Sequence, residues 1–148
     1  MLYPNVEPSA YCILSGYADS HPVRETKRLV SFSQLHGGQA YNNAFVRRAV
    51  SPIERLFGHN SGMLLKAAQR FDCERLGAGD YSVKIQALPL VPITIVLYEA
   101  SSEFSASANM LFDSSVSNYL STEQVAMLGE LTAARLKHAS DAFSHSIS

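Results

Sequence analysis

The sequence predicts an α+β fold in which a small antiparallel sheet packs against a cluster of short helices and a C-terminal helix. Two observations predict the strands. Apolar and polar residues alternate from Tyr81 to Ala87, and residues 93–99 are β-branched and almost continuously apolar. A third observation predicts the helices, because serine-led capping signals precede apolar runs in the middle and near the end of the chain.

The first elements are a helix and a strand. Residues 8–19 place Ala10, Leu14 and Tyr17 on one side at helical spacing, which predicts a short amphipathic helix. β-favouring residues then predominate in residues 28–35, and His36-Gly37-Gly38 ends that run. We therefore expect one short strand over 28–35.

Three short helices are expected in the centre of the chain. Residues 41–50 have helical spacing, and Ser51 followed by Pro52 predicts a capped helix that begins at Pro52. Gly58 ends this helix, and a third helix is expected over residues 61–71.

The sheet follows the helical cluster. Residues 81–87 predict a strand with one solvated face, and residues 93–99 predict a central strand that is covered on both faces. The short linker 88–92 joins them, so an antiparallel hairpin is expected. Residues 109–112 predict a further short strand.

The last element is the best-marked helix. Ser121 and Gln124 form a capping box, and Leu120 and Val125 are placed to form a hydrophobic staple. With no internal repeat or long linker, residues 1–139 are expected to form one domain, and the polar residues 140–148 a frayed tail. About 150 residues can bury roughly 70% of the surface of the unfolded chain, so such a domain needs no disulfide or metal.

The composition excludes several classes of protein. Twelve Lys and Arg against 13 Asp and Glu give a net charge of −1, which argues against a nucleic-acid partner. The longest apolar stretch, residues 88–98, contains two prolines and is shorter than the ~20 residues that span a bilayer, so no membrane partner is expected. Two cysteines, Cys12 and Cys73, and a start unlike a signal peptide favour a cytoplasmic protein.

Several short segments occur in an order that is recognisable. These are residues 32–41 with Phe45, Gly79-Asp80, residues 87–92, Glu103-Phe104, residues 111–113, and Tyr119-Leu120 with Glu123. In this order they resemble a prokaryotic domain of unknown function from anaerobic bacteria and archaea, some of whose members are described as iron-sulfur proteins. The resemblance covers residues 10–136.

The resemblance implies a shortened member of that family, because the family's N-terminal β segment is missing before the first helix. Residues 98–105 also keep only part of the acidic character that the family shows there. The iron-sulfur description does not carry over, because a cubane cluster needs four thiolates and this chain has two cysteines. The cofactor is therefore unknown.

Carboxylates, histidines and glycines supply the candidate site residues. Carboxylates that meet at strand ends can bind a hard cation or act in acid-base catalysis, although such residues are more often solvated loop groups. The two glycines could admit a phosphate, but a turn that needs positive φ explains them more simply. The candidate ligand-binding residues are His36, Gly37, Gly38, Tyr41, Tyr98, Glu99, Glu103 and Asp113.

Two weaker candidates stand beside these. His36 and His59 are potential metal or haem ligands, with Cys73 as a third, but isolated histidines near turns are usually surface residues and no metal is assigned. A basic sector could bind an anionic ligand or an acidic partner, although solvated helix faces explain most such sectors. It consists of Arg47, Arg48, Arg55, Lys66 and Arg70.

The functional hypothesis is a non-catalytic accessory module that holds a small molecule, a cofactor or a partner protein in the cleft between helices and sheet. The first alternative is a metal-dependent or acid-base enzyme that uses Glu99, Glu103 and Asp113 with His36. The second alternative is a structural subunit, in which an open sheet edge is covered by a second copy in a homodimer.

Overall fold

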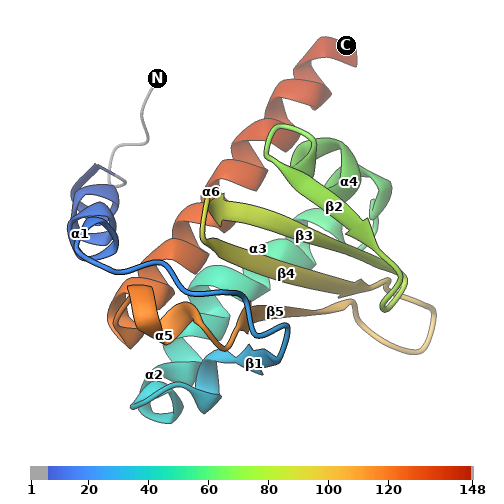
Figure 1. Cartoon of the computed structure of the whole chain (residues 1–148). Coiled ribbons are helices and arrows are strands. Elements are labelled where there is room, and N and C mark those ends of the chain that lie inside the picture. The colour runs from blue at the N-terminus through green and yellow to red at the C-terminus, as the bar shows by residue number, and fades with distance from the viewer. Residues whose placement is uncertain (1–6, 148) are drawn as a thin grey trace.

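The computed structural model describes residues 7–147, and the side chains of residues 12–143 within them. A five-stranded antiparallel sheet has the order β1-β5-β4-β3-β2, with helices α3, α4 and α6 behind it in Figure 1. The strands are β1 (Leu29–Ser31), β2 (Cys73–Leu76), β3 (Tyr81–Leu88), β4 (Val91–Tyr98) and β5 (Ser107–Asp113). The predicted α+β class is confirmed.

The predicted hairpin and the central strand are also confirmed. β3 and β4 pair with Tyr81 opposite Leu97 and Ile85 opposite Ile93. β4 lies in the middle of the sheet and is buried along its length except at Tyr98. Its side chains at 93, 95 and 97 join the main hydrophobic core, because alternate residues of a strand share one face.

The two edge strands are short. β2 was not predicted, because only two of its four residues are partly buried and it lacks an apolar alternation. Its pairing with the next strand, β3, in which Cys73 lies opposite Ile85, makes this segment a strand. β1 covers three residues, and the other sheet edge therefore also offers little backbone for pairing. The homodimer stays a prediction.

The helices are α1 (Glu7–Ala18), α2 (Gly38–Phe45), α3 (Ser51–Phe57), α4 (Gly62–Ala68), α5 (Val116–Tyr119) and α6 (Thr122–Ile147). A 3-10 turn, η1 (Phe32–Gln34), and a π-helical segment, η2 (Val46–Val50), complete the set. The strand expected over 28–35 is therefore shorter, because the chain turns at η1, where the Gln34 side chain accepts a hydrogen bond from the Ser31 N–H. The short α5 was not predicted.

The predicted break at Ser51 is wrong. Ser51 has helical angles, φ −58° and ψ −37°, and the residue in the N-cap position of α3 is Val50, whose side chain cannot cap a helix. The Ser51 N–H donates to the Val46 carbonyl across the wider π turn. Pro52 has no N–H to donate and disfavours a regular α turn before it, so α2, η2 and α3 continue as one helical stretch.

The capping box of the last helix is confirmed. The Ser121 Oγ accepts a hydrogen bond from the Gln124 N–H, and the Gln124 side chain accepts one from the Ser121 N–H. α6 continues beyond residue 139 to Ile147, so the helix is longer than the sequence predicts. Phe143 packs against the core, which gives this last part of the helix an apolar contact.

The linker between α1 and β1 returns to the sheet. Glu25 forms an ion pair with Lys84 of β3 at 2.9 Å, and the backbone of Lys27 bonds to Asp113 at the end of β5. No helix within the described residues is long and apolar enough to cross a membrane.

Candidate functional site

The candidate residues from the sequence lie at three separate positions. One group lies in the turn before α2 and in α2 itself, a second lies at the end of β4 and in the loop that follows, and Asp113 ends β5. Tyr98 pairs with Ser107, so the residues that follow β4 lie near the start of β5. β5 is seven residues long and spans about 20 Å, which separates them from Asp113. Glu99, Glu103 and Asp113 therefore do not form one acidic site.

Asp113 is 3% exposed, and its carboxylate bonds both to the linker and to Ser115. Its carboxylate accepts backbone N–H bonds from Thr26 at 3.0 Å, Lys27 at 2.7 Å and Ser115 at 3.0 Å, and a further bond from the Ser115 hydroxyl. Burial opposes ionisation, but the bonds from Ser115, Thr26 and Lys27 outweigh it and lower the pKa of Asp113. This carboxylate stabilises the fold.

Glu99 also forms hydrogen bonds that connect elements of the fold. Its carboxylate accepts a hydrogen bond from the Ser61 hydroxyl, just before α4, and its N–H donates to Asp80 Oδ2 at 2.8 Å. These bonds join the end of β4 to α4 and to the turn before β3. Tyr98, the preceding residue, is 45% exposed at the end of β4.

The backbone of the turn before α2 requires glycine at positions 37 and 38. Gly37 has φ +72°, a conformation that glycine adopts without steric cost. A Cβ on Gly38 would lie 2.0 Å from the Phe32 carbonyl oxygen, so only glycine fits there. The exposed His36 accepts a hydrogen bond from Thr122 through its carbonyl, and Tyr41 is exposed on α2.

A pocket lies between α3 and the loop that joins β4 to β5. Its volume is about 630 Å³, and we call it the loop pocket. Glu103 is the candidate residue that lines it. The lining residues are Glu54, Arg55, His59 and residues 100–106.

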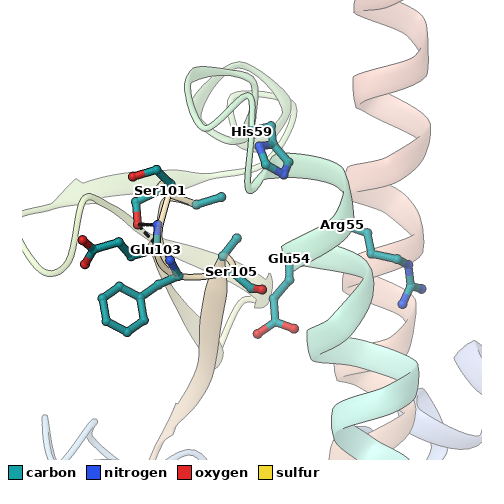
Figure 2. A pocket seen from close by; sticks show the side chains of 10 residues that line it. Glu54, Arg55, His59, Ser101, Glu103 and Ser105 are labelled. Atoms are coloured by element: carbon teal, nitrogen blue, oxygen red, sulfur yellow. Dashed lines mark hydrogen bonds between the residues drawn. The ribbon is translucent and has the colours of Figure 1, made fainter.

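Figure 2 shows how these side chains are arranged. Glu54 and Ser105 extend into the space between the loop and α3, and His59 lies at one end of it. Glu103 and Arg55 point away on opposite sides, so their charges lie at the rim. The centre of the loop pocket is therefore lined by a carboxylate and a hydroxyl, with an imidazole at one end.

Close contact at Gly58 holds the two sides of the loop pocket together. The Gly58 carbonyl accepts a hydrogen bond from the Ala100 N–H at 3.1 Å. A Cβ at Gly58 would lie 2.3 Å from the Ala106 Cβ, so the missing side chain lets the loop approach α3. Glu54 Oε2 accepts the Ala108 N–H at 2.9 Å, which fixes its carboxylate at the start of β5.

The tip of the loop is an ordered turn. Ser101 Oγ accepts the N–H bonds of Glu103 and Phe104, and the Ser101 N–H donates to the Phe104 carbonyl at 2.9 Å. The Phe104 side chain is 72% exposed at this tip. The turn thus presents an aromatic ring beside the polar loop pocket.

The sequence did not identify Glu54 and Ser105 as site residues. Glu54 lies on α3 and faces Ser105 because the missing side chain at Gly58 lets the loop approach this helix. His59 was considered as a metal ligand. Within the described residues, no group of three or more His, Cys, Asp or Glu side chains is placed to hold a metal.

The two cysteines are free thiols in different settings. Cys12 is exposed on α1, whereas Cys73 is partly buried on β2. Burial, with a contribution from the charge of Asp72, raises the pKa of the Cys73 thiol. A raised pKa disfavours the reactive thiolate.

Comparison with known proteins gives a family. No curated protein and no solved structure matches this chain. The family model named Domain of unknown function (DUF3786) matches residues 5–135, which include the whole sheet, the linker and the loop pocket. The chain belongs to the DUF3786 family of domains of unknown function.

Proposed function

We propose that this protein is a non-catalytic binding module and that the loop pocket holds a small polyhydroxylated molecule, such as a monosaccharide or a cyclic polyol. The observation that carries the proposal is the lining of one hollow by the Glu54 carboxylate and the Ser105 hydroxyl, which face each other, with the His59 imidazole at one end and the exposed Phe104 beside them. A volume of about 630 Å³ lies in the range of small-molecule sites.

The polar groups match the hydroxyl groups of such a ligand. Glu54 uses Oε2 for the Ala108 N–H, which leaves Oε1 to accept a bond from a ligand hydroxyl. Ser101 accepts two N–H bonds, so its own proton is left to donate outward. His59 can donate with one ring nitrogen and accept with the other. The lining therefore offers both donors and acceptors to the hydroxyl groups of a polyol.

The Phe104 ring would bind the apolar face of such a ligand. A pyranose or cyclitol has an apolar C–H face, and burying it against Phe104 removes apolar surface from water. The Ser101 turn holds the Phe104 backbone in place before the ligand arrives, which lowers the entropy cost of binding.

Free thiols at both cysteines support a reducing compartment, and we propose a cytoplasmic location. The accessory role follows from the same proposal, because a protein that holds a ligand without reacting with it serves another protein that does.

Calorimetric titration of the purified chain with D-glucose and with myo-inositol tests the proposal. We expect millimolar binding of at least one of these probes, and about tenfold weaker binding after Phe104→Ala or His59→Ala. His36→Ala is the matched control, because this exposed histidine does not line the loop pocket, and it is expected to bind as the wild type does. No heat of binding with either probe, or equal loss in the His36→Ala control, would contradict the proposal.

A further inference from the structure

A second hollow lies between two helices and is separate from the loop pocket. Its volume is about 330 Å³, and we call it the α2–α6 groove. Figure 1 shows α2 beside the first turns of α6. The groove is lined from the α2 side by Phe32, Tyr41, Ala44, Phe45 and Arg48, and from α6 by Thr122, Glu123, Ala126, Met127 and Glu130.

Each wall is one face of a helix. Tyr41, Phe45 and Arg48 recur at intervals of four and three residues, and Glu123, Met127 and Glu130 repeat that spacing on α6. Arg48 belongs to η2, and π-helical segments are frequent at functional sites.

The floor of the groove is aromatic and tightly packed. The rings of Phe32 and Phe45 stack with their centroids 4.3 Å apart and their planes 9° from parallel. Gly129 makes this packing against α6 possible, because a Cβ there would lie 2.8 Å from the Phe45 ring. Phe32 and Phe45 are themselves almost fully buried and act as a rigid base, so the apolar surface open to a ligand comes mainly from the half-buried Met127 and the exposed Tyr41.

The two walls of the α2–α6 groove carry charges of opposite sign. Arg48 lies on the α2 side, and the exposed Glu123 and Glu130 lie on α6. None of the three forms an ion pair within residues 12–143. The walls thus hold a cation and two anions apart across an apolar floor.

We propose that the α2–α6 groove binds a free amino acid with a large apolar side chain, of the leucine, methionine or phenylalanine type. The α-carboxylate pairs with the Arg48 guanidinium, which suits a planar carboxylate because it donates two parallel N–H bonds. The α-ammonium group pairs with Glu123 or Glu130. The apolar side chain covers Met127 and the 57% exposed Tyr41 ring, above the buried Phe45.

This arrangement requires both charges and the apolar body in one molecule. A ligand without the ammonium group loses its pairing with Glu123 or Glu130, and a ligand without the carboxylate loses the two parallel N–H bonds from Arg48. Glycine supplies both charges but buries no side chain on the floor, so it is expected to bind more weakly than leucine.

Equilibrium dialysis with radiolabelled L-leucine tests the proposal on the full chain. We expect saturable binding that unlabelled L-leucine displaces and that N-acetyl-L-leucine, L-leucinamide and glycine displace about tenfold less well. Arg48→Gln and Glu130→Gln should each weaken binding about tenfold or more. Arg47→Gln and Glu74→Gln are the matched controls, because both residues are exposed and lie outside the groove.

Two results would overturn the proposal. One is the absence of saturable leucine binding up to about 10 mM, and the other is equal displacement by the blocked derivatives. The proposal is independent of the loop pocket. Phe104→Ala is expected to leave leucine binding unchanged, so failure of either site is distinguishable from failure of the other.

Discussion

The carboxylate of Asp113 accepts a hydrogen bond from the backbone N–H of Lys27 at 2.7 Å, and Lys27 has φ +61°. Among the described residues Lys27 is the one non-glycine residue with positive φ. The bond therefore holds the linker in a conformation that a lysine rarely adopts. A buried carboxylate at the end of β5 fixes the path of a segment more than 80 residues earlier in the sequence.

Asp113→Asn is expected to destabilise the fold by about 2–3 kcal/mol, because the amide loses the charge that strengthens several N–H bonds and directs an NH₂ group toward N–H donors. Urea unfolding followed by circular dichroism measures the change. Asp141→Asn, at an exposed position on α6, is the control and is expected to change the free energy of unfolding by less than about 0.5 kcal/mol. Equal effects at the two positions would show that the Asp113 network contributes nothing.

The lowered pKa of Asp113 predicts a pH dependence of stability. The Asp113 carboxylate takes up a proton less readily in the folded protein than in the unfolded chain, where the pKa of an Asp is about 3.9. The contribution of Asp113 is therefore complete above that value and is lost as the pH falls through the folded pKa. Unfolding free energies measured from pH 6 to pH 2.5 should fall more steeply for the wild type than for Asp113→Asn. Parallel curves would refute this role.

Lys27→Gly is expected to stabilise the protein by about 0.5–1 kcal/mol, because glycine reaches positive φ without the Cβ clash. Arg24→Gly, in the same linker without positive φ, is the control. It should have the opposite sign, since glycine there only adds entropy to the unfolded chain. The measurement is the melting temperature of each variant, which should rise for Lys27→Gly and fall for Arg24→Gly. A lower melting temperature in both would contradict the expectation.

Two glycine substitutions should differ in sign. Gly38→Ala places a Cβ 2.0 Å from the Phe32 carbonyl oxygen and is expected to cost about 2 kcal/mol or more. Gly62→Ala, at the start of α4, meets no atom within 4 Å and is expected to gain about 0.5–1 kcal/mol. Thermal unfolding of both variants is the measurement. Similar values for the two would show that the turn before α2 adjusts freely.

The parts of the fold that the sequence predicted correctly depend on local signals. The alternation in β3, the apolar run in β4 and the Ser121 cap of α6 each act within a few residues. β2 was missed because its partner, β3, and not its own composition, makes it a strand. Ser51 followed by Pro52 indicated a new helix, but the π turn before them carried the helix through.

The candidate site was only partly predictable for the same reason. Glu103 and Tyr41 were identified, and each lines one of the two hollows. Glu54 and Ser105 come together only because Gly58 lets the loop approach α3, a contact that no spacing in the sequence reveals. Asp113 was predicted as a ligand residue, and the structure instead surrounds it with donors from the linker. A carboxylate's partners decide its role, and here they are distant in sequence.

The central claim is that the loop pocket binds a polyhydroxylated molecule, and amide chemical-shift mapping with myo-inositol and with D-glucose tests it most directly. We expect at least one of the two probes to cause saturable shifts in residues 54–59 and 99–106, with the amides that line the α2–α6 groove unchanged. Shifts that are absent with both probes at millimolar concentration, or that are spread evenly over the surface, would contradict the claim.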